Sequence, residues 1–433
     1  MTKTEMATDL ASLDVRLHGQ SVGTLARLPD DKTLFAFSQE YIENPDRPTL
    51  SLSFKDTFGK LIAGVAPAQT RLPPFFSNLL PEGSMRDYLA RRAQVKPQRE
   101  FYLMWALGRD LSGATRIVHE NDESLPPADA DNDAAAVDQR SSAEDVLRFS
   151  LAGVEMKFSA IREASGGLTI PADGVGGSWI VKLPSTRYAH VPENEFAIME
   201  LARRTGIDVP ETRLIPVSRI LGLPTQIDIA GALALSVKRF DRGPNGESIH
   251  MEDFAQVFGL YPERKYERAS YRSVARVLWT ETGEPGIAEL VRRLVFSALI
   301  GNADMHLKNL SLIYPDRVRA TLSPAYDLVS TIVYLHDEKM ALSFVDSKAF
   351  ASVSLEEFER FAAKAGVPRK PVLECAATTV EAFAKAWSDM DGIELDDSAR
   401  QTIAAHLETV PLWGQIRGRG SRIKRSARPG NSP

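Results

Sequence analysis

The sequence predicts an α+β protein of two lobes, one rich in strands and the next rich in helices, preceded by a small α+β subdomain. Three observations lead to this prediction. The chain of 433 residues is too long for one ordinary hydrophobic core. A stretch with almost no large apolar residue, 121–145, divides it. Beyond that stretch, short strand patterns come first and longer helical patterns follow.

Residues 14–120 are expected to form the small subdomain. Alternating apolar residues in its first part indicate short strands, for example at 34–37, and His18-Gly19-Gln20 is a turn signal between two of them. After Pro74 the apolar residues fall mostly at three- and four-residue spacings, which is typical of helices. The subdomain is therefore predicted to place strands first and helices second.

The rest of the chain divides by composition and periodicity. Residues 121–145 are rich in Asp, Ala and Pro, and we interpret them as a linker or mobile loop, because so little apolar surface cannot offset the entropy lost on ordering. Strand patterns predict a strand-rich lobe over 146–242, and helical periodicity predicts a helical lobe over 243–413. A basic flexible tail is expected at 414–433. The helical patterns include 251–258, 271–280, 287–300, 355–365 and 372–387.

Bulk composition excludes several classes of protein. A net charge of −5 argues against a nucleic-acid binder over the whole surface, although a local basic patch stays open. The single cysteine, Cys375, allows no intrachain disulfide, fits a reducing compartment and is best interpreted as a buried structural thiol. No apolar run approaches the roughly 20 residues of a membrane span, and the acidic N-terminus does not resemble a signal peptide. A cytoplasmic protein without a membrane partner is expected.

The strongest local pattern runs over 301–309, directly after an apolar helix. Asp304 and Asn309 have the Asp-x-x-x-x-Asn spacing with which a kinase catalytic loop supplies a carboxylate near the acceptor hydroxyl and an oxygen ligand for Mg²⁺. Lys308 could neutralise charge on a phosphate as it transfers. Taken alone, this spacing is common by chance, and a polar loop that caps two helices explains it better.

Two further positions fit the same chemistry. Asp327 comes eighteen residues after Asn309, on a turn that follows a strand pattern, where a second Mg²⁺ ligand is expected in kinases. By itself it could belong to an ordinary turn. Lys182 lies inside an apolar strand, where a buried ammonium needs a partner or a phosphate. A lysine at a strand edge is an equal alternative, and Glu193 and Glu195 are candidate partners that could also complement a helix dipole.

A segment with small residues, 150–157, follows the linker. Ala152 and Gly153 would let backbone N–H groups approach phosphate oxygens, and Lys157 adds a positive charge. The segment matches neither of the two common glycine-rich phosphate-binding patterns. Considered alone, a plain β-turn is therefore the stronger interpretation.

Five segments become specific when they are taken together and in order: 150–157, 179–184, 236–242, 301–309 and 322–327. Together they resemble the HipA family of toxin kinases. Three earlier segments resemble the N-terminal subdomain of that family: 22–25, 74–83 and 106–110. The resemblance runs from about Leu17 to Trp387. It implies a protein-kinase-like fold and a Ser/Thr protein kinase that uses ATP and Mg²⁺.

The resemblance also implies a role for each matching residue. Asp304 would be the catalytic base, assisted by Lys308, and Asn309 and Asp327 would hold Mg²⁺. Ser150 would be a serine that the enzyme phosphorylates on itself, and the added charge should expel the phosphate loop and disable the enzyme. The ATP-binding set would be Ala152, Gly153, Val154, Glu155, Met156, Lys157, Lys182, Lys238, Arg239, Phe240, His306, Leu307, Lys308, Asn309, Tyr326 and Asp327.

Two positions depart from the family pattern. Glu155 stands where the family often has Gln, and a carboxylate beside phosphates is mildly unfavourable unless Lys157 or Mg²⁺ offsets it. Lys238 opens the hinge where the family often has Glu. Because that hinge would hold adenine chiefly through backbone groups, recognition should survive the change. Neither departure removes a catalytic group, and activity is predicted.

The resemblance implies partners as well. HipA-like proteins are typically encoded beside a small helix-turn-helix antitoxin (HipB-like), and the pair represses its own operon on operator DNA. The substrate would be a component of translation, an aminoacyl-tRNA synthetase by family resemblance, whose phosphorylation arrests growth. A small-molecule or lipid kinase and a mainly non-catalytic co-repressor are the alternatives. The tail could contact DNA phosphates or could be a solvated terminus, and its basic residues are Arg417, Arg419, Arg422, Lys424, Arg425 and Arg428.

Overall fold

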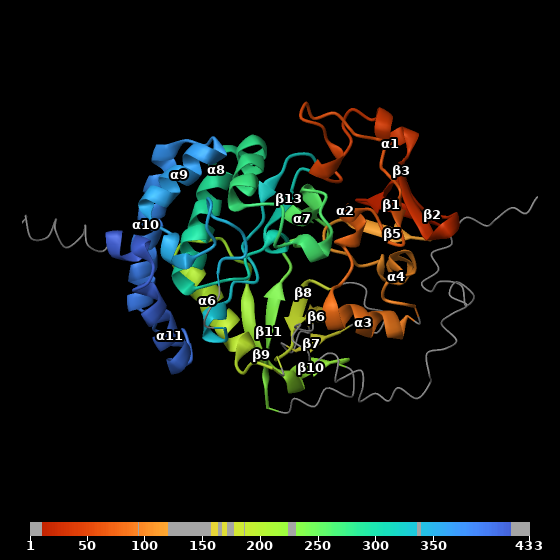
Figure 1. The fold of residues 1–433 in the computed structure, drawn as a ribbon. Coiled ribbons are helices and arrows are strands. Elements are labelled where there is room, and N and C mark those ends of the chain that lie inside the picture. The colour runs from red at the N-terminus through yellow and green to blue at the C-terminus, as the bar shows by residue number, and fades with distance from the viewer. Residues whose placement is uncertain are drawn as a thin grey trace, which may run out of the picture.

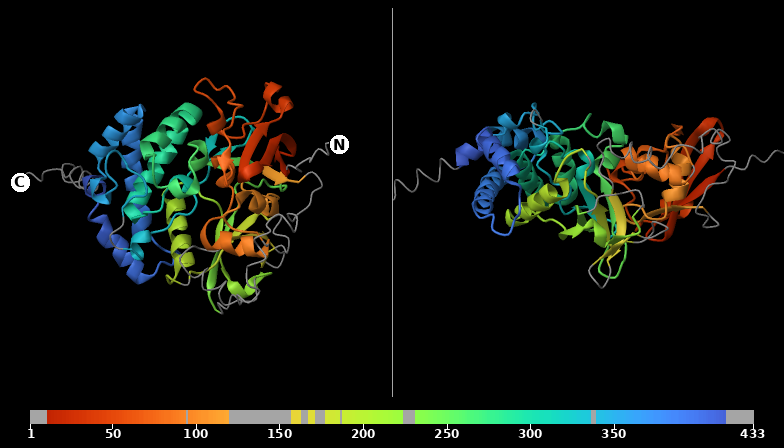
Figure 2. Two further views of the ribbon diagram at one scale, coloured as in Figure 1. Left: turned by 45° about the vertical axis from the view of Figure 1, so that its right-hand side comes forward. Right: turned by 90° about the horizontal axis from the view of Figure 1, so that it is seen from below.

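The computed structural model describes residues 11–93, 95–119, 157–162, 167–170, 177–185, 187–223, 231–335 and 339–416. It confirms the predicted α+β fold, in which a strand-rich lobe precedes a helical one. Three parts lie beside one another: an N-terminal unit, a six-stranded sheet and a helical lobe (Figure 1). In the view from below, the six-stranded sheet lies between the other two parts (Figure 2). Within the described ranges, no helix is both long and apolar enough to cross a membrane.

The N-terminal unit is a five-stranded antiparallel sheet with helices packed against it. The first two strands form a hairpin whose turn has Gly19 at a φ of 82°, a conformation that glycine adopts without strain. Phe35, Phe75 and Phe76 are buried in its core. The sheet order is β4-β3-β2-β1-β5. The elements are β1 (Ser12–Leu17), β2 (Gln20–Leu28), β3 (Lys32–Phe37), α1 (Gln39–Glu43), β4 (Ala68–Gln69), α2 (Pro74–Ser77), α3 (Gly83–Arg92), α4 (Glu100–Leu107) and β5 (Thr115–Val118).

The second sheet has the order β10-β7-β6-β8-β11-β9. One face packs against α6 (Val191–Arg204), which buries Ile198 and Leu201. The other face carries a small separate core that includes Trp179 and Val181. One face of this sheet is therefore covered by a helix, and the other face carries its own small hydrophobic core. The strands are β6 (Lys157–Arg162), β7 (Leu168–Thr169), β8 (Trp179–Lys182), β9 (Thr212–Pro216), β10 (Ile220–Leu221) and β11 (Leu233–Lys238).

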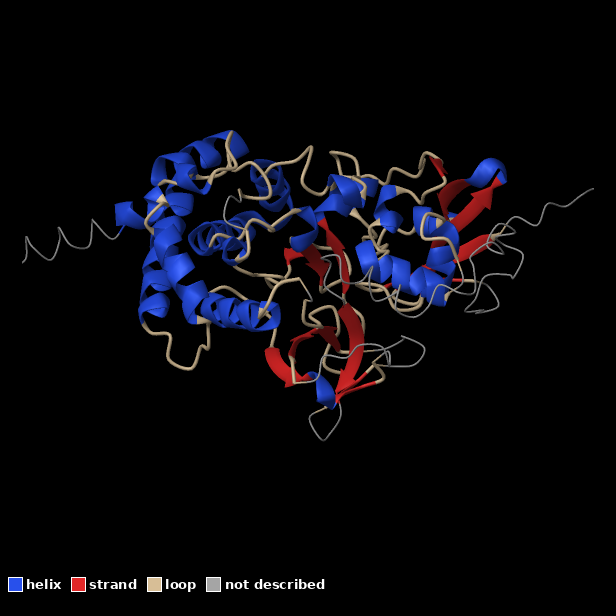
Figure 3. Cartoon of the chain, turned by 60° about the horizontal axis from the view of Figure 1, so that its bottom comes forward, coloured by secondary structure: helices blue, strands red, loops and turns tan. Residues whose placement is uncertain are grey.

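The helical lobe is built around α8 (Tyr271–Ile300), and Figure 3 shows its helices gathered at the end of the molecule away from the N-terminal sheet. The sequence predicted two helices here, and the structure agrees: α8 consists of two helical stretches that a kink at Gly283, just before Pro285, divides. Gly301 ends α8 at a φ of 65°, and a Cβ there would lie 2.5 Å from the Ile332 side chain. Only glycine fits this position, so it fixes how the next loop leaves the helix. The other helices are α9 (Leu355–Ala365), α10 (Arg369–Ser388) and α11 (Asp397–Leu407).

A third sheet joins the helical lobe to the N-terminal unit. Its order is β12-β13-β14, with β12 at His250–Asp253, β13 at Ser311–Tyr314 and β14 at Thr321–Leu322. The predicted helix over 251–258 was therefore wrong in its first half, and only α7 (Phe254–Val257) is helical. Pairing with β13, a strand distant in sequence, overrides the local helical pattern.

The carboxyl of Glu252, on β12, is buried at the contact with the N-terminal unit. It accepts hydrogen bonds from Ser51 Oγ at 2.5 Å, from the Leu52 N–H at 2.9 Å and from the Tyr314 hydroxyl. Burial raises the pKa of Glu252 to about 7, although these hydrogen bonds act in the opposite direction. The protonated carboxyl is therefore favoured in the folded protein below neutral pH.

This raised pKa predicts a pH-dependent stability. Because the folded-state pKa lies above the unfolded one, the contribution of Glu252 is fully present below about pH 4.3 and is lost as the pH rises to about 7. The loss should reach roughly 3 kcal/mol of unfolding free energy. Urea unfolding of wild type and Glu252→Gln at pH 5 and pH 8 checks this. We expect the unfolding free energy of Glu252→Gln to rise relative to that of wild type between pH 5 and pH 8. An equal difference in unfolding free energy at both pH values would contradict the prediction.

Candidate active site

Two lysines lie side by side on the face of the six-stranded sheet that α6 covers. Strand pairing sets Lys157 of β6 opposite Lys182 of β8, so both side chains point to the same face. Like charges in such a pair repel, and the arrangement needs anions nearby. Two carboxylates meet this need: Glu195 of α6 pairs with Lys182, and Asp327 pairs with both lysines. Since β8 lies between β6 and β11, Lys182 is not at a sheet edge.

Asp327 is the point where distant parts of the chain meet. Its Oδ1 is 2.6 Å from Lys182 Nζ, and its Oδ2 is 2.8 Å from Lys157 Nζ. Burial alone would raise its pKa, but Lys157 and Lys182 outweigh burial and hold the pKa well below its usual range. Its backbone has a φ of 54°, a left-handed conformation that is uncommon outside glycine and that is often found at functional sites. The carboxylate is thus an anion held in a defined place.

The loop after Gly301 has a shape fixed by several hydrogen bonds. Asn302 Oδ1 accepts from the Asp304 N–H at 2.8 Å. The Ala303 N–H donates to Thr331 Oγ1 at 2.8 Å, and the Tyr271 hydroxyl donates to the Met305 carbonyl at 2.9 Å. Side chains of Thr331 and of Tyr271 on α8 thus fix the backbone of this loop through hydrogen bonds.

Within this loop, the predicted Asp304 and Asn309 come together. Asn309 Nδ2 donates to the Asp304 carbonyl oxygen at 2.8 Å, so its side-chain oxygen is the atom left to bind a ligand. The carboxylate of Asp304 is 45% exposed and accepts from the Tyr266 hydroxyl at 2.5 Å. His306 Nε2 lies 3.8 Å from Asp304 Oδ1. Burial lowers the pKa of His306 to about 4, so this ring is neutral at physiological pH.

The ammonium group of Lys308 turns towards the N-terminal unit. It is 2.9 Å from the carbonyl oxygen of Asn78, 3.2 Å from Asn78 Oδ1 and 3.1 Å from Glu82 Oε1. An ammonium has three N–H donors, and these acceptors can occupy all of them. Lys308 was predicted as a group that neutralises phosphate charge. In this structure its ammonium joins the loop to the N-terminal unit.

The predicted hinge contributes ring packing and backbone groups more than charged side chains. Lys238 pairs with Trp179 across the strands, so its side chain lies on the sheet face opposite the two lysines. The guanidinium of Arg239 is buried in ion pairs with Asp241 and Asp110, so its charge is already balanced. The Phe240 ring packs against Tyr326, with ring centroids 5.5 Å apart.

Tyr326 connects the hinge to the loop. Its hydroxyl donates to the Lys308 carbonyl oxygen at 2.8 Å and lies 2.5 Å from Ser311 Oγ. Because Tyr326 directly precedes Asp327, the hinge, the loop and the two-lysine cluster form one continuous region. The Leu307 side chain is buried in the core of the helical lobe, so only its backbone can face a ligand. Ser150, Ala152, Gly153, Val154, Glu155 and Met156 lie outside the described residues.

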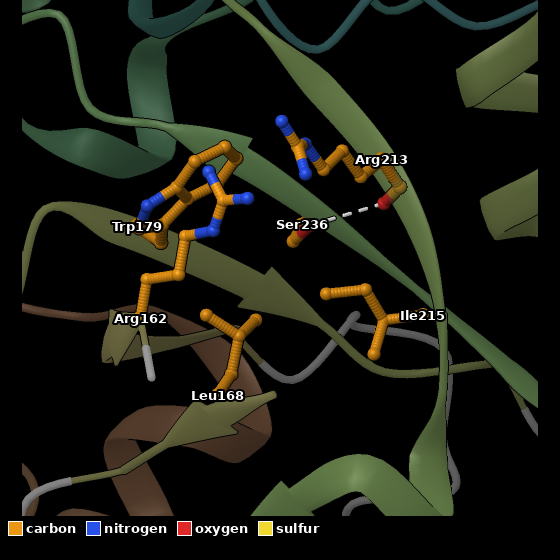
Figure 4. Close-up of a pocket in the computed structure, with 6 residues that line it drawn as sticks. All are labelled: Arg162, Leu168, Trp179, Arg213, Ile215 and Ser236. Atoms are coloured by element: carbon orange, nitrogen blue, oxygen red, sulfur yellow. Dashed lines mark hydrogen bonds between the residues drawn. The ribbon is translucent and has the colours of Figure 1, made fainter. Parts of the chain in front are cut away.

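A small hollow on the six-stranded sheet is separate from this region. Figure 4 shows it lined by Trp179, two arginines and three smaller side chains: Arg162, Arg213, Leu168, Ile215 and Ser236. Strand pairing places Trp179 and Ser236 on the face opposite Lys182. The hollow therefore belongs to the outer face of the sheet.

Some residues of the region were not singled out as site residues from the sequence. Tyr266, which bonds Asp304, lies in a charged stretch with no motif. Asn78 and Glu82 lie within the N-terminal segment 74–83, whose link to the loop had no visible signal because the two are far apart in sequence. Glu195 had been named as a candidate partner of Lys182, and the structure pairs them.

Comparison with known proteins gives matches over both halves of the chain. Residues 13–118 match the HipA N-terminal domain, and residues 149–387 match the HipA-like C-terminal domain. The chain is 52% identical to "Putative kinase Y4dM" of Sinorhizobium fredii over 408 residues, which cover 93% of this chain and 98% of that protein. It is 26% identical over 396 residues to "Serine/threonine-protein kinase toxin HipA" of Shewanella oneidensis, covering 83% of this chain and 84% of that one.

A solved structure shows the same fold. It is the HipA of Shewanella oneidensis MR-1 in a complex of HipA, HipB and operator DNA. The match has a TM-score of 0.70 and 21% sequence identity, and it covers 94% of this chain and 99% of that one. At this identity the likeness concerns the fold alone.

Proposed function

We propose that this chain, which belongs to the HipA family, is a Ser/Thr protein kinase that transfers the γ-phosphate of ATP to a protein hydroxyl. Relatives along nearly the whole chain carry kinase names, and a family of kinases implies the use of ATP. One observation carries the finer proposal: Asp327 lies between Lys157 and Lys182, in one region with the Asp304–Asn309 loop. This is the arrangement that phosphoryl transfer needs.

The residues present fit a magnesium-bound nucleotide. Mg²⁺ prefers oxygen ligands, and Asp327 offers an ionised carboxylate while Asn309 offers its side-chain oxygen. Lys157 and Lys182 repel each other across the strands, so phosphate anions would stabilise a pair that the fold otherwise balances with carboxylates. Asp327 and Asn309 would hold the Mg²⁺, which would supply positive charge against the phosphates when bound.

Asp304 is the proposed catalytic base. Its carboxylate is exposed enough for an acceptor hydroxyl to reach it, and Tyr266 fixes it through Oδ1, which leaves Oδ2 for the acceptor. The hydroxyl would give its proton to Asp304 while its oxygen forms a bond to the γ-phosphorus. The bond from that phosphorus to the bridging oxygen would break, and ADP would leave. Lys182, held by Glu195, would bind the phosphates during this step.

The nucleotide base would lie at the hinge beside Phe240. The Lys238 N–H donates to the Glu211 carbonyl at 2.8 Å, and the Arg239 N–H donates to the Ser178 carbonyl at 2.8 Å, so these two amides are already engaged. Among the described residues, no backbone carbonyl accepts from the Phe240 N–H. We therefore assign the Phe240 amide as the hinge donor to adenine.

The cellular role we propose is that of a HipA-type toxin in the cytoplasm. It would arrest growth by phosphorylating a translation component such as an aminoacyl-tRNA synthetase, and phosphate on Ser150 would silence it. It would also act as a co-repressor with a HipB-like helix-turn-helix antitoxin on operator DNA. The complex of the Shewanella HipA with HipB and its operator DNA supports the partner proposal.

Transfer of labelled phosphate tests this function. The purified chain is incubated with γ-³²P-ATP, Mg²⁺ and a cell lysate, and we expect a labelled protein band. Label found only in small molecules would support a small-molecule or lipid kinase instead. Peptide mass spectrometry after incubation with ATP and Mg²⁺ should find phosphate on Ser150, and its absence in an active enzyme would defeat the self-inactivation proposal.

A further inference from the structure

We propose that the N-terminal unit positions the catalytic loop through a cluster of contacts centred on the carboxylate of Glu82, and that Lys308 acts in this cluster and not on phosphate. The inference rests on the proposed kinase function. Glu82 directly precedes α3, and its two oxygens reach out of the N-terminal unit in different directions. Oε1 lies 3.1 Å from Lys308 Nζ, and Oε2 lies 3.0 Å from Lys265 Nζ.

Both lysines are attached to the loop that carries the proposed base and metal ligand. Lys308 is part of the loop, and the Lys265 carbonyl accepts from the Leu307 N–H at 3.3 Å. Asn78 adds two more acceptors for Lys308, and its own Nδ2 donates to the Leu260 carbonyl at 2.7 Å. We call Asn78, Glu82, Lys265 and Lys308 the loop clamp.

The loop clamp is a network in a partly covered place, which distinguishes it from an ordinary surface pair. The side chain of Lys308 is 15% exposed, that of Lys265 22% and that of Glu82 32%. Burial raises the pKa of Glu82, but Lys308 and Lys265 lower it by more, so the net shift is downward and Glu82 stays ionised. Several charges that share partners in this way contribute more than an isolated exposed pair.

The chain also contains a matched control for the loop clamp. Arg71 and Glu263 form an ion pair at 3.0 Å that likewise joins the N-terminal unit to the helical lobe. Their side chains are 42% and 57% exposed, and the bond between them involves no residue of the loop 301–309. Glu263→Gln therefore removes one carboxylate at the same contact between the two parts without touching the loop.

Losing Glu82 should affect the rate of transfer more than nucleotide binding. Lys308 directly precedes Asn309 in the chain, and Asn309 donates a hydrogen bond to the Asp304 carbonyl. A displaced Lys308 would therefore displace Asn309 and Asp304 as well. We expect Glu82→Gln to lower kcat by about 10- to 100-fold, the effect of a misplaced catalytic group. The KM for ATP should stay within about twofold, because Lys157, Lys182 and the hinge would hold the nucleotide. Lys265→Met, which removes another member of the loop clamp, should act in the same direction.

A double variant separates positioning from direct catalysis. If Glu82 and Lys308 act as one unit, the Glu82→Gln/Lys308→Met variant should be no slower than Lys308→Met alone. If Lys308 instead contacts phosphate, Lys308→Met should raise the KM for ATP, and the two losses should multiply. The second result would overturn the inference. Glu263→Gln is expected to match wild type in kcat and in KM.

Hydrogen exchange gives a readout that does not need activity. We expect amides of residues 301–312 to exchange faster in Glu82→Gln and in Lys308→Met than in wild type, and at the wild-type rate in Glu263→Gln. Unchanged exchange in both clamp variants would refute the loop clamp. If wild type transfers no phosphate at all, the proposed function fails, and exchange in this loop still decides whether Glu82 positions it.

Discussion

Asp304→Asn is expected to lower phosphoryl transfer by about 10²- to 10⁴-fold while ATP binding stays close to wild type. Asparagine cannot take the proton of the acceptor hydroxyl at neutral pH, so the proposed base is lost. The loop should keep its shape, because Asn309 bonds the backbone carbonyl of residue 304 and not its side chain. The Tyr266 hydroxyl can still donate to an amide oxygen at the same place. Initial rates of ³²P incorporation and titration with a fluorescent ATP analogue measure the two quantities.

The same substitution separates a toxin that acts by catalysis from a mainly structural co-repressor. Growth arrest that persists unchanged with Asp304→Asn would exclude catalysis as its cause. Asp346→Asn is the matched control, since Asp346 is 54% exposed and its ion pairs among the described residues are with Arg360 and Lys364 on α9. A transfer rate in Asp304→Asn within about twofold of that control would contradict the role of Asp304, since the loss of a base is larger.

Local spacing was enough to single out Asp304 and Asn309 as candidates, but not to identify their partners. Asp304 and Asn309 could be predicted because both belong to one loop whose spacing follows directly from its chemistry. That Lys157, Lys182 and Asp327 meet could be expected only from family resemblance, because the contact depends on strand register. The partners of Lys308 could not be foreseen.

The secondary structure also depends partly on local sequence patterns and partly on contacts between residues that are distant in sequence. Alternation and helical periodicity predicted β1 to β3 and α9 correctly, since each buries one face of its own pattern. One error arose where a tertiary contact decides. β12 reads as helix in isolation and becomes a strand because it pairs with β13. The helical periodicity around Gly283 and Pro285 predicts two helices, and the kink at Gly283 within α8 confirms that division.

The side chain of Asp241 is the centre of a buried ion network behind the hinge. Its Oδ1 accepts from Arg239 Nε at 2.9 Å, and its Oδ2 accepts from Arg239 Nη2 at 2.8 Å and from Arg242 Nη1 at 2.9 Å. It also accepts from the Gly113 N–H at 2.8 Å, which ties the N-terminal unit to the hinge. Burial would raise the pKa of Asp241, but Arg239, Arg242 and Gly113 lower it by more, so the carboxylate stays ionised.

Asp241→Asn is therefore expected to destabilise the protein by about 3–5 kcal/mol, the usual effect of removing one partner of a buried ion pair. The new amide group would face guanidinium donors, and Asp110 alone among the described residues would keep ion pairs with both arginines. Because the folded-state pKa of Asp241 is depressed, its contribution is present above about pH 3.9 and is lost as the pH falls through the folded-state value. Urea unfolding at pH 7 should show the loss in Asp241→Asn and little change in Asp346→Asn. A loss below about 1 kcal/mol would mean that water or the backbone replaces the carboxylate, and that the hinge is held by packing such as Phe240 on Tyr326.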